Sequence, residues 1–284
     1  MPPKIENMRL SQTQLNLLET CPRKFQHTYL EQLGAPATPE QQEKLAWGSR
    51  FHQVMQQREL GLPVKSLVRQ YPQILEWVTA LDKAAPEIFS PAAETAAETV
   101  ADPAAAPTGK SFRQAEHWRT LHFQDYTFAA VYDLLIADDK SAAILDWKTY
   151  PRPQDRKWVA QNWQTRLYPF VLAETSNYLP ETISMTYWFV ESKGEPNEPE
   201  SLIFSYDEGQ HQKTKEDLTR LLSGLTDWLD RYQKDIEPFP QVSLAAGRCT
   251  GCQFAIRCQR DRSLIESTAH AELSDLATIE EVVV

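Results

Sequence analysis

The sequence contains no apolar run that approaches the ~18 residues of a membrane-spanning helix. Its first residues, MPPKIENMRLS, are polar and lack the apolar core of a secretory signal peptide. We therefore expect a cytoplasmic protein that has no membrane partner. Hydrophobic residues make up 42% of the 284 residues and charged residues 24%, which is ordinary for a globular chain with a sizeable core.

Cysteine is scarce, with four residues in the whole chain. Cytoplasmic thiols stay reduced, so a disulfide scaffold is not expected. Three of the four follow the spacing Cys249-x2-Cys252-x5-Cys258, and the fourth, Cys21, lies far upstream. Three thiolates leave a four-ligand metal site incomplete, so the spacing indicates a site that also takes Cys21. Spacing alone is compatible with zinc and with a [4Fe–4S] cluster.

Positive charge is also in deficit, because the net charge is −10. Taken alone, this value argues against a nucleic-acid partner. The acids are unevenly spread, however: residues 87–107 hold four and residues 263–284 hold five, and neither range contains Lys or Arg. Without these nine charges the net charge of −10 becomes −1. A local basic surface is therefore neither excluded nor supported.

A nucleotide-driven motor is not recognisable in this sequence. The stretch AAAPTGKS at 104–111 resembles a phosphate-binding loop, but Ala104 stands where the first glycine is required. It also follows a Pro/Ala-rich stretch instead of a strand. We therefore expect a stand-alone protein or a subunit of a larger assembly.

Local patterns predict one α/β domain with a mixed sheet. A capping box at Ser11–Gln14 opens the first helix, which Cys21-Pro22 interrupts. An Ala/Pro-rich insert covers about 90–110 and an acidic polar tail covers 263–284. Helices are expected near 11–33, 40–60, 64–89, 156–174 and 210–235, and strands near 112–123, 126–137, 142–149, 183–190 and 202–206.

Two acids and a lysine occupy unusual places in the predicted hairpin. Asp146 and Lys148 lie in ILDWKTY, an otherwise β-prone run, and alternation places them on one face of the strand. Asp133 lies on the preceding strand. Two close carboxylates favour a shared cation, and Mg²⁺ prefers carboxylate oxygens and water. A neighbouring ammonium can stabilise charge on a reacting phosphate. The alternative interpretation is a surface ion pair on an edge strand.

These residues, together with three others, resemble the PD-(D/E)XK nuclease superfamily, in the branch of RecB- and AddB-like nucleases and CRISPR-associated iron–sulfur exonucleases. The matching pieces are GSRFH at 48–52, VYD at 131–133, LDWK at 145–148 and QTRLY at 164–168. The resemblance implies a restriction-endonuclease-like mixed sheet flanked by helices. It also implies the site residues: His52, Asp133 and Asp146 as metal ligands, Lys148 as the catalytic lysine, and Gln164 and Tyr168 as supporting residues.

Three further residues bear on this site. Glu116, in RQAEHW, is a weaker candidate for an additional acid because its spacing is loose. Val131 and Tyr132 stand where family members often carry glycine. Their bulk is therefore expected to crowd the approach of metal or DNA.

The resemblance extends to the cysteines. In this branch, one N-terminal cysteine and a C-terminal triplet hold a [4Fe–4S] cluster, and SQTQLNLLETCPRKFQHTY and CTGCQFAIRC match both halves. The implied cluster ligands are Cys21, Cys249, Cys252 and Cys258. Such a cluster would join the N- and C-terminal segments of a nuclease domain that covers residues 1–262.

The resulting hypothesis is a Mg²⁺- or Mn²⁺-dependent DNA nuclease, acting as an exonuclease on single strands or ends in DNA repair or recombination. DNA is the expected partner, with a helicase or a repair complex as a further one. The alternative is a non-catalytic DNA-binding or scaffold subunit that keeps the fold and the cluster. A zinc-stapled protein of unrelated function is a third interpretation.

Overall fold

A computed structural model describes residues 8–34, 36–89, 112–191 and 198–260. The predicted insert at about 90–110 and the tail at 263–284 lie outside these residues. The chain divides into two compact units. Unit 1 comprises Met1–Gln41, His122–Phe128 and Lys215–Val284, and unit 2 comprises Gln42–Leu121 and Ala129–Thr214. Among the described residues, no helix is both long and apolar enough to cross a bilayer.

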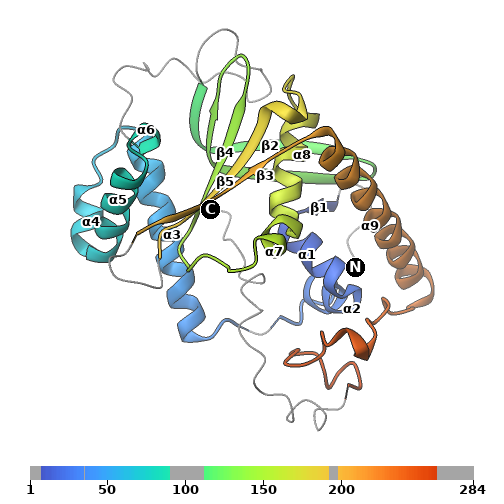
Figure 1. Cartoon of the computed structure of the whole chain (residues 1–284). Coiled ribbons are helices and arrows are strands. Elements are labelled where there is room, and N and C mark those ends of the chain that lie inside the picture. The colour runs from blue at the N-terminus through green and yellow to red at the C-terminus, as the bar shows by residue number, and fades with distance from the viewer. Residues whose placement is uncertain (1–7, 35, 90–111, 192–197, 261–284) are drawn as a thin grey trace. The chain divides into compact units, whose positions relative to one another are not determined.

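The described residues form a mixed sheet of six strands, in the order β1-β3-β4-β5-β6 with β2 paired to β3 (Figure 1). β1 is parallel to β3, and β4 is parallel to β5, whereas β3–β4 and β5–β6 are antiparallel. The predicted α/β class with a mixed sheet is thereby confirmed. The strands are β1 Met8–Leu10, β2 Phe112–Phe123, β3 Tyr126–Ala137, β4 Ala142–Lys148, β5 Ile183–Phe189 and β6 Glu200–Ser205.

Helices begin where the sequence provides caps or proline. Ser11 and Gln14 form the predicted capping box, and Asn162 caps α8 by accepting a hydrogen bond from the Gln164 N–H. Pro22, Pro72 and Pro86 each open a helix, where the missing N–H costs nothing. The helices are α1 Gln12–Thr20, α2 Pro22–Phe25, the π-helix η1 Gln26–Leu30, α3 Pro39–Glu59, α4 Lys65–Gln70, α5 Pro72–Ala84, α6 Pro86–Phe89, α7 Arg156–Gln161, α8 Trp163–Glu174, η2 Pro180–Thr182, α9 Glu208–Asp235 and η3 Leu244–Ala246.

The predicted helix over 156–174 is wrong as a single element. Asn162 adopts an extended backbone with ψ 139°, so its carboxamide oxygen can cap the next helix. The chain therefore forms two helices, α7 and α8. This break matters because it places Gln164 in the first turn of α8, next to the site described below. β1 is a strand that the sequence patterns did not predict.

The core of unit 2 forms between α3–α6 and one face of the sheet. Phe51, Val54 and Met55 of α3 are almost fully buried. They pack in one cluster with Trp147 of β4 and Trp188 of β5. Burying each such side chain contributes about 1.5–3 kcal/mol, so this cluster anchors α3 to the sheet. Figure 1 shows α4, α5 and α6 grouped beside α3.

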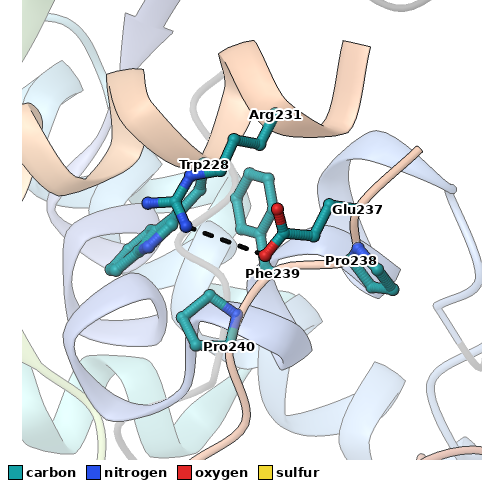
Figure 2. A pocket seen from close by; sticks show the side chains of 6 residues that line it. All are labelled: Trp228, Arg231, Glu237, Pro238, Phe239 and Pro240. Atoms are coloured by element: carbon teal, nitrogen blue, oxygen red, sulfur yellow. Dashed lines mark ion pairs between the residues drawn. The ribbon is translucent and has the colours of Figure 1, made fainter. Parts of the chain in front are cut away.

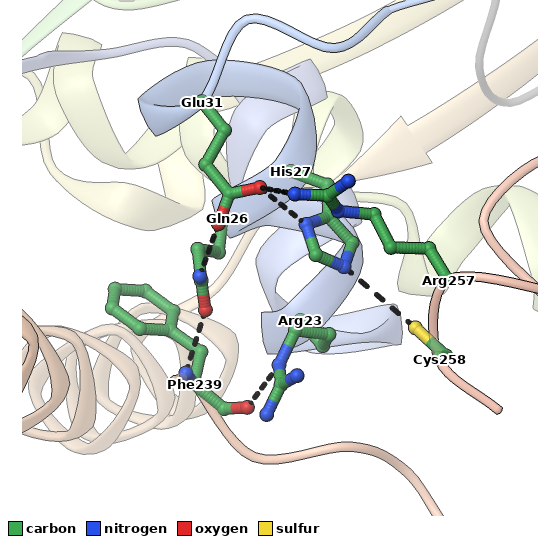
Figure 3. Close-up of polar contacts among 7 residues, drawn as sticks. All are labelled: Arg23, Gln26, His27, Glu31, Phe239, Arg257 and Cys258. Carbon is green, nitrogen blue, oxygen red and sulfur yellow. Dashed lines mark hydrogen bonds and ion pairs between the residues drawn. The ribbon is translucent and has the colours of Figure 1, made fainter. Parts of the chain in front are cut away.

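In unit 1, polar contacts join segments more than two hundred residues apart in sequence (Figure 3). The Arg23 Nε donates to the Phe239 carbonyl at 2.5 Å, and the Phe239 N–H donates to Gln26 Oε1 at 2.6 Å. Arg257 pairs with Glu31 at 3.5 Å. The N- and C-terminal segments are therefore held together by protein side chains.

Candidate active site

Three side chains from three elements of unit 2 come together as a group suited to a metal ion. His52 lies on α3, Glu116 on β2 and Asp133 on β3, and one ligand atom from each lies within 4.8 Å of the other two. His52 Nδ1 is 3.1 Å from Asp133 Oδ1, with side-chain exposures of 28% and 10%. The group is partly open, as a site that must admit a substrate requires.

Glu116 enters this group through an unusual backbone. Its φ is +49°, in the left-handed region, although it lies inside a strand and is not glycine. Such a conformation costs about 1–3 kcal/mol and is typical of functional sites. The sequence prediction undervalued this residue, although a signal was available. A two-residue turn joins Phe123 of β2 to Tyr126 of β3. Glu116 lies seven residues before Phe123 and Asp133 lies seven residues after Tyr126, so a regular hairpin would place the two acids opposite each other.

Asp133 also ends the pairing of β3 with β4. The backbone register of the two strands begins at Leu134–Leu145, and beyond it the Trp147 N–H donates to Asp133 Oδ2 at 2.7 Å. The carboxylate thus replaces a backbone carbonyl. Trp147 stands between Asp146 and Lys148 in sequence, so this bond connects the metal-site group to the second half of the site.

Asp146, Lys148 and Gln164 form that second half. Asp146 is 2% exposed, and its Oδ1 accepts from Gln164 Nε2 at 2.7 Å. Its Oδ2 lies 2.8 Å from Lys148 Nζ. The predicted same-face placement of Asp146 and Lys148 is therefore present, and the pair is buried instead of lying on an exposed edge. A buried pair of this kind is costly unless further hydrogen bonds complete it, which Gln164 does.

The structure thus divides the predicted ligand set. It brings together His52 and Asp133, but their third partner within 4.8 Å is Glu116. Asp146 instead contacts Gln164 of α8 and Lys148 of its own strand, β4. The carboxylate-rich group His52–Glu116–Asp133 suits a hard cation such as Mg²⁺ or Mn²⁺, because these ions prefer carboxylate oxygens and tolerate water in their remaining positions.

Tyr168 of α8 contacts Tyr132, the residue that precedes Asp133. Its side chain is buried, and its backbone carbonyl accepts from the Tyr132 hydroxyl at 3.0 Å. Tyr132 is fully buried, and burial raises the pKa of its hydroxyl. The expectation that the bulk of Tyr132 crowds the approach of metal or DNA is therefore wrong, because its side chain points into the core.

Burial dominates the electrostatics around the site. It raises the pKa of Tyr187, and the charge of Asp146 raises it further. Burial also lowers the pKa of His117 to about 4, and the Arg119 charge acts in the same direction. Both side chains are therefore neutral at neutral pH. Tyr187 lies beneath Lys148, whose Nζ is 5.6 Å from the centre of its ring.

The four cysteines lie in unit 1 and are half-buried. Burial raises the pKa of Cys258, Arg23 opposes this effect, and the charges of Cys252, Cys21 and Cys249 add to it. The other three thiols are therefore near enough to act on Cys258. No three of the cysteines in the described residues lie within 4.8 Å of one another. Tetrahedral zinc would hold its sulfurs about 3.8 Å apart.

A small cavity of about 80 Å³ lies elsewhere in unit 1 (Figure 2). Trp228 and Arg231 of α9 line it, and Arg231 pairs with Glu237, which also lines it, at 3.7 Å. The remaining lining residues are Pro238, Phe239 and Pro240. None of the candidate site residues contributes to this cavity.

This fold and this site define a class of protein. The family model of the PD-(D/E)XK nuclease superfamily matches residues 9–259, and the chain belongs to that superfamily. No curated protein matches the chain. Among solved structures, the chain is similar to the crystal structure of a "Putative exonuclease" from Eubacterium rectale. The TM-score is 0.52 with 14% sequence identity, and the alignment covers 94% of each chain. At this identity the likeness shows the fold alone.

Proposed function

We propose that the protein is a divalent-metal-dependent DNA nuclease that hydrolyses phosphodiester bonds as an exonuclease. The observation that carries this proposal is the pairing of two groups. The first group is the imidazole of His52 with the carboxylates of Glu116 and Asp133, and the second group is the buried Lys148–Asp146 ion pair. Membership of the nuclease superfamily supports a nucleic-acid substrate.

Each residue of the site has a proposed role. His52, Glu116 and Asp133 hold the cation, and Asp146 is an additional ligand, as the family resemblance implies. When bound, the cation supplies a Lewis acid that polarises the phosphate and promotes attack by water. Lys148 stabilises the negative charge that develops on the phosphate, because its ammonium is held in place and largely shielded from solvent. Gln164 orients Asp146, and Tyr168 supports Asp133 through Tyr132.

We further propose that Cys21, Cys249, Cys252 and Cys258 hold a [4Fe–4S] cluster. Two observations support it: the other three thiols act electrostatically on Cys258, and side-chain contacts already hold the two segments together. Iron and sulfide analysis of protein purified without oxygen tests this proposal. Stoichiometric zinc with no iron would contradict it.

The nuclease proposal is tested with end-labelled single- and double-stranded DNA in Mg²⁺ or Mn²⁺. Wild-type protein should shorten the substrate from its ends, and Lys148→Gln should not. Lys140→Gln is the matched control, because Lys140 is an exposed lysine in the β3–β4 turn. If wild-type protein binds DNA without cutting it, the scaffold function replaces the nuclease. Cleavage of an unlabelled circular substrate would contradict the exonuclease mode.

Association with a helicase or a repair complex is a proposal that rests on the family alone. Co-purification of the tagged full-length chain from its host tests it. Recovery of the chain as a monomer under low-salt conditions would contradict it.

A further inference from the structure

Two stacked rings lie directly behind the metal-site acids. His117 comes directly after Glu116, and Tyr132 comes directly before Asp133. Their ring centres lie 6.0 Å apart with an interplanar angle of 20°, so the rings stack. Neighbouring side chains of a strand point to opposite faces. The same two strands, β2 and β3, therefore carry the acid pair on one face and the ring pair on the other.

The His117 ring is held firmly and uses little of its polarity. The ring packs edge-on to Phe112 at 5.3 Å, and its Nδ1 lies 2.8 Å from Gln114 Oε1. Its Nε2 is buried and has no hydrogen-bond partner among the described residues. A buried nitrogen without a partner is unfavourable. The ring therefore contributes through its packing as well as through its contact with Gln114.

Tyr132 connects this stack to α8. Its ring contacts that of Tyr168 at 5.3 Å, and its hydroxyl donates to the Tyr168 carbonyl at 3.0 Å. One helical turn earlier, Gln164 holds Asp146 at 2.7 Å. α8 thus contacts both halves of the site, one through Gln164 and the other through the rings of Tyr132 and His117.

We propose that the His117–Tyr132 stack is a positioning element that sets the separation of Glu116 and Asp133. It holds the two strands at the register where their carboxylates meet His52. It also holds the strained backbone of Glu116, which would otherwise relax to an extended conformation and carry its carboxylate away. This inference rests on the proposed metal site and adds two residues that contact neither metal nor substrate.

Mn²⁺ binding tests the proposal without any nuclease assay. Free Mn²⁺ is measured by electron paramagnetic resonance during titration of the full-length protein. His117→Leu and Tyr132→Leu remove a ring, whereas His117→Phe and Tyr132→Phe keep one. Glu116→Gln identifies binding at this site. Tyr126→Leu is the matched control, because Tyr126 is a buried tyrosine on the same strand, β3, and its hydroxyl is also hydrogen-bonded. Thermal unfolding of each variant is recorded in parallel.

We expect both leucine variants to bind Mn²⁺ about tenfold more weakly or worse, as is usual when groups supporting a metal ligand are lost. The Mn²⁺ affinity of both phenylalanine variants and of Tyr126→Leu should stay within about threefold of the wild-type affinity. This should hold even if Tyr126→Leu unfolds at a lower temperature. The proposal would be overturned if the leucine variants bound Mn²⁺ with wild-type affinity while Glu116→Gln bound it more weakly. An equal loss of Mn²⁺ affinity in Tyr126→Leu would also overturn it, since general destabilisation of the fold would then explain the weaker binding. Wild-type protein that does not bind Mn²⁺ would overturn the proposed metal site and this inference together.

Discussion

Gln164 donates a hydrogen bond to the buried carboxylate of Asp146 at 2.7 Å, from the first turn of α8. The residue reaches this position because Asn162 breaks the preceding helix and caps the next one. The interaction gives Asp146 a second partner besides Lys148, and a buried carboxylate needs both.

Removing the Gln164 amide should therefore cost stability and activity together. Gln164→Leu removes the hydrogen bond to the buried Asp146 carboxylate, which should lower the free energy of unfolding by about 1–3 kcal/mol. Urea unfolding followed by circular dichroism measures this change. Gln161→Leu is the control, because Gln161 is exposed in α7. Equal stability of the two variants would show that Asp146 does not depend on Gln164.

Glu116 should trade stability against metal affinity. Asn adopts the left-handed region more readily than Glu does, so Glu116→Asn should raise the free energy of unfolding in EDTA, by about 0.5–1 kcal/mol. The same variant should bind Mn²⁺ more weakly, because it lacks the carboxylate. Thr120→Asn, at an exposed position of the same strand, should show neither effect. A lower free energy of unfolding of Glu116→Asn in EDTA would contradict the inference that the backbone at Glu116 is strained.

Asp133→Asn should separate the structural role of Asp133 from its charge. The Asn carboxamide oxygen can still accept from the Trp147 N–H, whereas its charge at the metal group is lost. In EDTA we expect stability close to that of wild type. Mn²⁺ at 100 times its wild-type dissociation constant should stabilise wild type by about 2.7 kcal/mol, and the variant by much less. Equal stabilisation of both proteins would place the ion elsewhere.

Stability should fall in acid partly through Glu31. Burial raises the pKa of Glu31, but hydrogen bonds from His27 and Gln26 and the charges of His27 and Arg257 bring it below its ordinary value of 4.5 (Figure 3). A carboxyl with a lowered pKa stabilises the folded state above the unfolded pKa, and this contribution is lost as the pH falls through the folded pKa. Urea unfolding between pH 7 and pH 3 should therefore show a shallower acid decline for Glu31→Gln than for wild type. Glu43→Gln, at an exposed position of α3, should keep the wild-type slope.

Local pattern predicted some parts of this protein well. The bounds of β2 and β3 agree with the expected strands, and the capping box at Ser11 is present, because alternation and capping depend on residues close in sequence. The break at Asn162 was missed, since an amphipathic pattern continues through it. β1 was missed because three residues carry too little periodicity.

The sequence by itself determined the order of the motifs, the superfamily they belong to and the strand that carries both Asp146 and Lys148. Only the tertiary structure decided which acids lie together. Glu116 joins His52 and Asp133 because of a left-handed backbone and a hairpin register, whereas Asp146 is held by α8. The direction of a carboxylate depends on backbone strain and on the helix packed against it, and neither is encoded in the spacing of the motifs.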